Sequence, residues 1–489
     1  MNTANPDKKL VIRCLQKILP AESVLYQAED LRPYECDGLS AYQQVPMVVV
    51  LPETVKQIED ILAFCAHEKI PVVARGAGTG LSGGALPLEN GILMSLAKFN
   101  RIVDIDTENR TARVQPGVRN LAISEAASAH GLYYAPDPSS QIACTIGGNV
   151  AENAGGVHCL KYGLTVHNIL KLEVITIQGE HLTIGGDALD SPGYDLLALM
   201  TGSEGLLAVI TEITVKLLPV PEAANVILAA FDDVATAGQA VSNVIADGIL
   251  PAGLELMDNA AIRAADDFVN AGYPRDAAAI LLCEIDGSST EVSDQLERAL
   301  QLLKSSGATE SRVARDEQQR ARFWAGRKAA FPAVGRLSPD YYCMDGTIPR
   351  YQLAKVLTHI SELSNAYGLP IVNVFHAGDG NLHPLILYDA NIDGELERTE
   401  ELGGRILELC VEAGGTITGE HGVGMEKINQ MCVQFNDREL QQFHAIKHAF
   451  DPDTLLNPGK AIPTLHRCAE FGAMHVHHGQ LPHPELERF

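Results

Sequence analysis

Two long glycine-rich segments constrain the fold of this 489-residue chain more than any other feature. The first, RGAGTGLSGGALP, follows a predicted strand at residues 71–75, and the second is PDPSSQIACTIGGNVAENAGG. Glycine permits close backbone approach and positive φ angles, so the N–H groups of such segments can point at a phosphate. Short predicted strands bracket both segments. We therefore expect the two segments to hold one phosphate-containing cofactor from opposite sides.

The spacing of Gly78, Gly80 and Gly83 also matches the G-x-G-x-x-G pattern of Rossmann dinucleotide-binding folds. That fold requires a helix that begins at the third glycine. Here Pro87 and Gly91 follow, and both residue types interrupt helices. The sequence therefore predicts a pyrophosphate-binding loop rather than a Rossmann turn.

The pattern of predicted elements changes midway along a chain that is too long for one hydrophobic core. Helical and alternating apolar periods predict short strands and two helices in the first half. After Pro219 and Pro221, strand and helix patterns predict an antiparallel sheet covered by helices, and hence an α+β protein. The predicted parts are an N-terminal helical segment (1–41), a cofactor-binding domain (42–221), a substrate and metal domain (222–462) and a C-terminal tail (463–489).

Charge and hydropathy exclude two classes of partner. The formal net charge is −25 and no basic segment is concentrated enough to bind nucleic acid. No apolar run approaches the roughly 18 residues of a membrane span, and the N-terminal stretch lacks the apolar core of a signal peptide. We therefore expect a cytoplasmic protein that acts on a small molecule.

The ten cysteines are spread from Cys14 to Cys468 without a C-x-x-C pair. This spacing excludes the usual iron–sulfur and zinc-ribbon sites, and it favours reduced thiols over disulfides. A redox enzyme of this kind would have to pass its electrons to another chain.

Two short segments of the second half carry histidine and carboxylate side chains. FHAGDGNLHPLIL places His376 and His383 on either side of a tight turn, and TGEHGVG adds Glu420 and His421. Two imidazoles and one carboxylate leave open positions on a zinc- or manganese-type ion. His421 would then be free to act as a base. The alternative for each segment is structural: hydrogen-bonded histidines and an exposed loop.

PVVARGAGT, PDPSS, TIGGNVAENAGG and GSEGLLAVITEI resemble, in the same order, segments of the vanillyl-alcohol-oxidase-type (PCMH-type) FAD-binding domain. The resemblance implies an FAD cofactor. Members of this family often attach the flavin through histidine or cysteine, which makes His158 and Cys159 candidates, but the dehydrogenase branch implies non-covalent FAD. The residues implied to surround FAD are Arg75, Gly76, Ala77, Gly78, Thr79, Gly80, Ser82, Pro136, Asp137, Thr145, Gly147, Gly148, Asn149, Glu204, Gly205, Ile210 and Asn457.

The second half resembles the ferredoxin-like, FAD-linked oxidase C-terminal domain of the D-2-hydroxyacid dehydrogenases. The resemblance implies a divalent metal that chelates the substrate, a general base, and hydride transfer to FAD. It also implies that an arginine in QRARFWAGRKAAF binds the substrate carboxylate, although a solvated helix arginine is the alternative. The residues implied are the metal ligands His376, His383 and Glu420, the base His421 and the carboxylate-binding Arg327.

Two departures from the D-2-hydroxyglutarate branch bear on the substrate. That branch has a lysine in the strand that matches YYCMDGTIP, whereas the segment around Cys343 has none. Pro384 and Leu385 follow the second histidine, shortly after which that branch has an asparagine. Fewer polar anchors predict a shorter substrate with one carboxylate, such as glycolate or D-lactate.

The resemblance further implies a second flavin-type subunit and an iron–sulfur subunit that pass electrons to the respiratory quinone pool, so the chain could lie at the membrane surface through its partners. Two alternatives stay open: a self-sufficient D-lactate dehydrogenase, and a non-enzymatic flavin relay or scaffold subunit. The tail histidines, His475, His477 and His478, are interpreted as part of a docking segment or, alternatively, a metal-delivery site.

Overall fold

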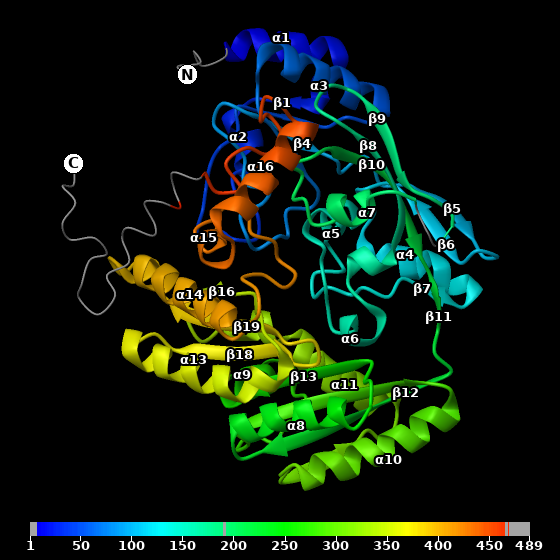
Figure 1. The fold of residues 1–489 in the computed structure, drawn as a ribbon, viewed down its shortest axis with the longest axis vertical. Coiled ribbons are helices and arrows are strands. Elements are labelled where there is room, and N and C mark those ends of the chain that lie inside the picture. The colour runs from blue at the N-terminus through cyan, green and yellow to red at the C-terminus, as the bar shows by residue number, and fades with distance from the viewer. Residues whose placement is uncertain (1–6, 189–191, 465–467, 469–489) are drawn as a thin grey trace.

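The computed structural model describes residues 7–188, 192–464 and 468, so the tail histidines lie outside the described residues. Two small sheets, a two-stranded pair of β7 (Leu132–Tyr133) and β11 (Leu218–Pro219), and their helices make up the first half of the chain. One large sheet makes up most of the second half (Figure 1). In the view of Figure 1 the large sheet lies below the first half, and the last helix, α16 (Asp437–Phe450), returns to the first half.

The smaller of the two N-terminal sheets carries the first glycine-rich segment. Its order is β1 (Val24–Leu25), β2 (Val48–Val50), β4 (Ile92–Ser95), β3 (Val72–Arg75), and β2 and β3 run parallel to β4. Helix α3 (Val55–Glu68) begins with a capping box between Thr54 and Gln57 and packs its apolar face into the core beside this sheet. Helix α1 (Lys8–Ile18) buries Val11 and Leu15 in the same core.

The second N-terminal sheet is antiparallel and carries the predicted hairpins. Its order is β5 (Ile102–Asp106), β6 (Thr111–Val114), β10 (Val209–Lys216), β8 (Ile169–Ile175), β9 (His181–Gly185). Helices α4 (Asn120–Ala127) and α5 (Ile146–Glu152) pack against it, and α5 begins inside the second glycine-rich segment. The predicted pairings of residues 102–115 and 170–184 are confirmed.

The large sheet of the second half is antiparallel, as predicted. Its order is β15 (Glu310–Val313), β12 (Ala223–Phe231), β14 (Ala279–Gly287), β13 (Gly253–Asp258), β18 (Ile371–His376), β19 (Asn381–Tyr388), β16 (Asp340–Cys343), and β17 (Gly346–Thr347) also pairs with β19.

Both faces of this sheet are covered by helices, and alternate strand residues therefore enter two separate cores. One core contains residues of α8 (Val234–Ala246), α10 (Ser289–Ser305), α13 (Leu353–Tyr367) and α14 (Glu395–Glu412). The other contains residues of α9 (Asn259–Val269), α11 (Glu317–Lys328) and α12 (Ala330–Val334). In β12, for example, Ile227 faces the first core and Val226 the second.

The end of the described chain is built into the first half. The N–H of Val72 donates to the carbonyl of Leu455, and the N–H of Asn457 donates to the carbonyl of Val72, so this segment extends the edge at β3. The buried Lys447 ammonium also donates to the carbonyls of Leu206 and Leu456. These bonds join α16 and the following residues to the cofactor-binding half.

One expectation about cysteine is wrong. Cys432, in α15 (Met431–Gln434), forms a disulfide with Cys468, 36 residues further along the chain. The spacing rules search for close pairs, whereas this pair is brought together by the fold. The remaining eight cysteines are free thiols, as predicted.

Across the parts of the chain that the structure describes, every helix is too short or too polar to cross a membrane.

Candidate functional site

One cavity is bounded by both halves of the chain. Its volume is about 370 Å³, within the range of small-molecule sites. Residues of both glycine-rich segments line one side, and Lys328, Phe331, His383, Glu420 and His421 line the other.

The two glycine-rich segments meet at this cavity, as predicted. A Cβ atom added to Gly76 would lie 2.2 Å from Oγ1 of Thr145, so only glycine allows the first segment to approach the second this closely. Gly78 has a φ of +72°, in the left-handed region that favours glycine. Residues 76–91, all of them described, contain no helix, which confirms a loop rather than a Rossmann turn.

Most of the residues predicted to bind FAD line the cavity. They are Arg75, Gly76, Ala77, Gly78, Thr79, Gly80, Thr145, Gly147, Gly148, Asn149, Glu204, Gly205 and Ile210. The other four, Ser82, Pro136, Asp137 and Asn457, are not among the residues that line the cavity. We call the two glycine-rich segments that line the cavity, with the loop at Glu204 and Gly205, the cradle. The amide of Asn457 donates to the carbonyls of Gly84 and Glu204, and so fixes two loops of the cradle.

His158 and Cys159 lie outside the cavity lining. The His158 ring bonds Asp137 through Nδ1 at 2.7 Å and Glu284 through Nε2 at 3.4 Å. Burial disfavours the charged ring, but these two carboxylates overcome it and raise the pKa of His158 to about 10. His158 therefore links the second glycine-rich segment to β14 as a charged pair with both ring nitrogens occupied.

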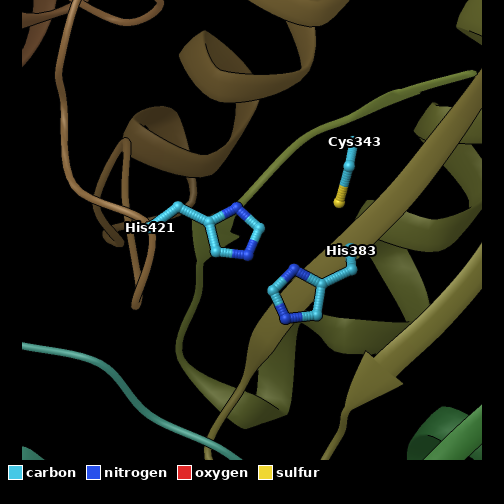
Figure 2. Close-up of side chains that lie close together, drawn as sticks. All are labelled: Cys343, His383 and His421. Carbon is cyan, nitrogen blue, oxygen red and sulfur yellow. The ribbon is translucent and has the colours of Figure 1, made fainter. Parts of the chain in front are cut away.

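The predicted histidine hairpin is present. Strands β18 and β19 pair around the Asp379–Gly380 turn, with Val374 opposite His383. Figure 2 shows His383 beside His421, and their rings stack with centroids 5.0 Å apart. The thiol of Cys343, from the adjacent strand β16, lies next to both rings (Figure 2).

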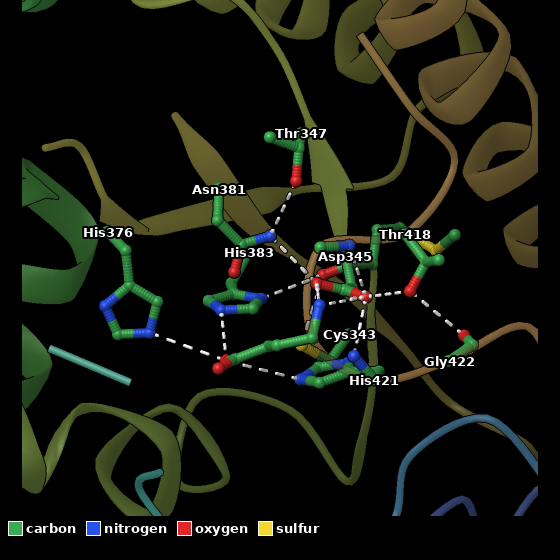
Figure 3. Close-up of polar contacts among 12 residues, drawn as sticks. Cys343, Asp345, Thr347, His376, Asn381, His383, Thr418, His421 and Gly422 are labelled. Carbon is green, nitrogen blue, oxygen red and sulfur yellow. Dashed lines mark hydrogen bonds and ion pairs between the residues drawn. The ribbon is translucent and has the colours of Figure 1, made fainter. Parts of the chain in front are cut away.

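The three predicted metal ligands converge on one point. Oε1 of Glu420 lies 3.5 Å from Nε2 of His376 and 3.0 Å from Nε2 of His383 (Figure 3). Two ligands of a tetrahedral zinc-type ion, each bound at about 2.1 Å, are roughly 3.4 Å apart. The other oxygen of Glu420, Oε2, is buried without a hydrogen-bond partner. The residues therefore fit a divalent ion in both geometry and donor type.

A buried ion pair between Arg327 and Glu255 contacts the Nδ1 side of the His376 ring. Its Nδ1 lies 2.9 Å from Oε1 of Glu255, and Oε2 of Glu255 accepts from Nε of Arg327 at 2.7 Å. A carboxylate bonded to Nδ1 in this way fixes the orientation of the ring, and Nε2 then points toward Glu420. Arg327 is 1% exposed and lies outside the cavity lining, whereas its neighbour Lys328 lines the cavity.

Electrostatics keep the proposed base neutral. Burial is the largest effect on His421 and lowers the pKa of its ring to about 4. At neutral pH the ring is therefore uncharged and can accept a proton. Burial opposes the charge of Glu420, but His376 and His383 hold the pKa of this carboxyl well below its usual range.

Asp345 organises the loop that carries Glu420 and His421, and the sequence did not reveal it. Its carboxylate is fully buried and accepts from the backbone N–H groups of Gly419, Glu420 and His421 at 3.0, 3.1 and 2.9 Å. The Thr418 hydroxyl and the Asn381 amide donate to it as well (Figure 3). Asp345 thus sets the orientation of the predicted metal ligand Glu420 and of the predicted base His421 together.

Three further residues at the site were missed, namely Glu255, Lys328 and Glu152. Glu152 lines the cavity from the end of α5, and its Oε2 is buried without a partner. Burial, with the neighbouring Glu204, raises the pKa of Glu152 well above its usual value. The one sequence feature that could have indicated Glu152 is its position within the glycine-rich stretch GGNVAENAGG.

Comparison with known proteins agrees with this geometry. A family model of an FAD binding domain matches residues 46–185, and a model of the C-terminal domain of FAD linked oxidases matches residues 220–461. The glycolate oxidase subunit GlcD of Escherichia coli (strain K12) is 67% identical over 483 residues, which cover 99% of this chain and 97% of that protein.

More distant relatives extend the same relationship. The glycolate oxidase subunit GlcD of Bacillus subtilis (strain 168) is 40% identical, over 87% of this chain and 91% of that protein. The D-lactate dehydrogenase of Archaeoglobus fulgidus is 34% identical, over 86% of this chain and 92% of that protein. Among solved structures, p-cresol methylhydroxylase with substrate bound superposes with a TM-score of 0.79 at 18% identity, over 94% of this chain and 97% of that one, and shows the same fold.

The two-part fold and the glycine-rich cradle, together with these matches, define a flavin-dependent oxidoreductase with FAD as its cofactor. Within that class, the chain belongs to the family of FAD-linked oxidases that includes the glycolate oxidase subunit GlcD of Escherichia coli. The predicted PCMH-type architecture is thereby confirmed.

Proposed function

We propose that this chain oxidises a small 2-hydroxy acid with one carboxylate, glycolate or D-lactate, to the 2-oxo acid. The observation that carries the proposal is that a flavin cradle and the histidine–carboxylate cluster face the same cavity. The names of the relatives, glycolate oxidase subunit and D-lactate dehydrogenase, support the same substrate class.

The mechanism must remove the proton of an alcohol near neutral pH. That proton lies about eight or nine pKa units out of reach, which corresponds to roughly 12 kcal/mol. We propose that His376, His383 and Glu420 hold a zinc- or manganese-type ion, whose chemistry is to lower the pKa of an oxygen bound to it. The neutral ring of His421 accepts the proton at the cavity wall.

Non-covalently held FAD, in this proposal, accepts the hydride, and the cradle orients it. The paired state of His158 supports non-covalent binding, because both of its ring nitrogens already have carboxylate partners.

The charge of the cavity supports a substrate with a single carboxylate. Among the described residues of the lining, Arg75 and Lys328 carry the fixed positive charges, and Arg75 belongs to the flavin cradle. Lys328 is then available for one carboxylate, while Cys343 and Leu385 offer no second cation. A second, unpaired carboxylate would be costly to bury.

Steady-state rates with glycolate, D-lactate, L-lactate and D-2-hydroxyglutarate, measured with an artificial acceptor, test this function. We expect the highest kcat/KM with glycolate or D-lactate. One additional methyl group changes selectivity by only about 1–3 kcal/mol, so both should be accepted. The highest kcat/KM with D-2-hydroxyglutarate would contradict the proposal.

We further propose that a second flavin-type subunit and an iron–sulfur subunit receive the electrons at the cytoplasmic face of the membrane. The naming of the relatives in Escherichia coli and Bacillus subtilis as subunits supports this, as does the lack of a C-x-x-C pair in the sequence. The alternative is a self-sufficient D-lactate dehydrogenase, and the name of the Archaeoglobus fulgidus relative supports its substrate. Full turnover of the isolated chain with a quinone would favour the alternative.

A further inference from the structure

A second group of potential metal ligands adjoins the first. One ligand atom each from Cys343, His383 and His421 lie within 4.8 Å of one another. The three residues come from β16, from β19 and from the loop before α15, so the fold rather than local sequence brings them together. Figure 2 shows the thiol and the two rings around one common space.

The chemistry of this second group differs from that of the first. A thiolate and two imidazoles form an N₂S donor set, which favours zinc and softer ions such as cadmium, whereas His376, His383 and Glu420 form an N₂O set. Cys343 and His383 are 4% and 1% exposed, so the group is shielded from bulk water.

The distances between the three ligand atoms are close to the distances between the ligands of a bound ion. Zinc–sulfur bonds of about 2.3 Å and zinc–nitrogen bonds of about 2.1 Å place tetrahedral ligand atoms roughly 3.4–3.6 Å apart. The three ligand atoms lie within 4.8 Å of one another, so the most distant pair would have to approach by at most about 1.4 Å.

We propose that Cys343, His383 and His421 form an inhibitory site for a thiophilic divalent cation, zinc or cadmium. Binding replaces the thiol proton by the metal and releases that proton to solvent. His383 belongs to both groups, so an ion at the second site shares an imidazole with the first. The ion at the second site also binds a ring nitrogen of His421. The inhibitory consequence rests on the proposed function, in which His421 is the base, but the binding itself does not.

Cadmium titration of the FAD-loaded protein tests binding directly. A cadmium–thiolate bond produces an ultraviolet charge-transfer absorption that is seen in a difference spectrum. We expect this band in the unaltered protein and in Cys410→Ser, which removes another buried thiol of the same half. We expect no band in Cys343→Ser, nor in Cys343→Ala, which serves as a second variant if the serine variant does not fold. No band in the unaltered protein, or a band retained without Cys343, would overturn the site.

Turnover measured in the same titration tests inhibition. Cadmium should lower the rate of the unaltered protein at least tenfold at concentrations that leave Cys343→Ser active. A band that depends on Cys343 but leaves turnover unchanged would overturn the inhibitory role. If no 2-hydroxy acid is oxidised even without cadmium, the proposed function fails, and the absorption band still decides the site.

Discussion

The carboxylate of Asp345 accepts a hydrogen bond from the backbone N–H of His421 at 2.9 Å, although the two residues are 76 positions apart. The same carboxylate accepts from the N–H groups of Gly419 and Glu420. Burial opposes the charge, but His421 and Lys427 hold the pKa of Asp345 below its usual range, so it is ionised. One buried charge therefore positions both the predicted base and a predicted metal ligand.

Asp345→Asn should lower kcat at least tenfold. The asparagine amide would present N–H donors to a loop that already presents three N–H donors, so the loop must shift. Turnover, metal content and FAD absorbance measured on one preparation check this. Asp340→Asn, on the more exposed start of the same strand, is the matched control. Unchanged turnover with Asp345→Asn would contradict the positioning role.

Removal of a metal ligand should abolish turnover without affecting the binding of FAD. His376→Ala or Glu420→Ala should abolish oxidation of the 2-hydroxy acid while FAD stays bound, because the cradle belongs to the first half of the chain. Flavin absorbance after gel filtration and metal analysis provide the measurements. Dialysis against a chelator should have the same effect, and full activity of metal-free protein would refute metal-assisted proton removal.

The pH dependence of kcat/KM should reflect the buried His421. The pKa of its ring is about 4, because burial disfavours the charged form. The base then stays neutral, and kcat/KM is maintained, as the pH falls through the ordinary histidine range near 6.5. Stability behaves differently: between about pH 6.5 and pH 4 the unfolded chain binds the additional proton, so the free energy of unfolding decreases as the pH falls. An acid limb of kcat/KM centred near 6.5 would show that the base is solvated in the working enzyme.

The attachment of the flavin gives a direct check on His158. FAD should be released in full by acid precipitation, because the charged pair with Asp137 and Glu284 leaves the ring without a free nitrogen lone pair. Flavin that remained in the protein pellet would establish a covalent bond and contradict this prediction.

Local patterns were enough to predict the parts of the site that are contiguous in sequence. The turn at Asp379–Gly380 and the alternation on both sides of it predicted the hairpin that places His376 and His383. The high glycine content of the two segments predicted that they would surround a phosphate-containing cofactor. Neither rule could find Asp345 or Glu255, because a buried carboxylate is recognisable only once its donors are in place, and these donors lie from 36 to 121 positions away.

The same limit explains the disulfide between Cys432 and Cys468, and the docking of the chain end at Val72. Both depend on the return of α16 to the first half of the chain. The resemblance pointed to Asn457 as part of this return, but not to its hydrogen bonds with Gly84 and Glu204.

Arg327 and Lys328 offer the sharpest test of how the substrate carboxylate is held. The sequence resemblance implied Arg327, yet its guanidinium lies 2.7 Å from Glu255, behind His376 and outside the cavity lining. Lys328 lines the cavity on the side of the histidine cluster. We therefore expect Lys328→Ala to raise KM about tenfold, equivalent to about 1.4 kcal/mol, with metal content unchanged.

Arg327→Ala should act differently, because it leaves Glu255 as a buried carboxylate with only His376 as its partner. The loss should weaken metal binding by about 10–100-fold and lower kcat through the metal. Steady-state kinetics and metal analysis of both variants, with Arg322→Ala on the exposed face of the same helix as the control, distinguish the two roles. If Arg327→Ala instead raised KM and kept its metal, Arg327 would be the carboxylate ligand, and its contact with Glu255 would have to open when the substrate binds.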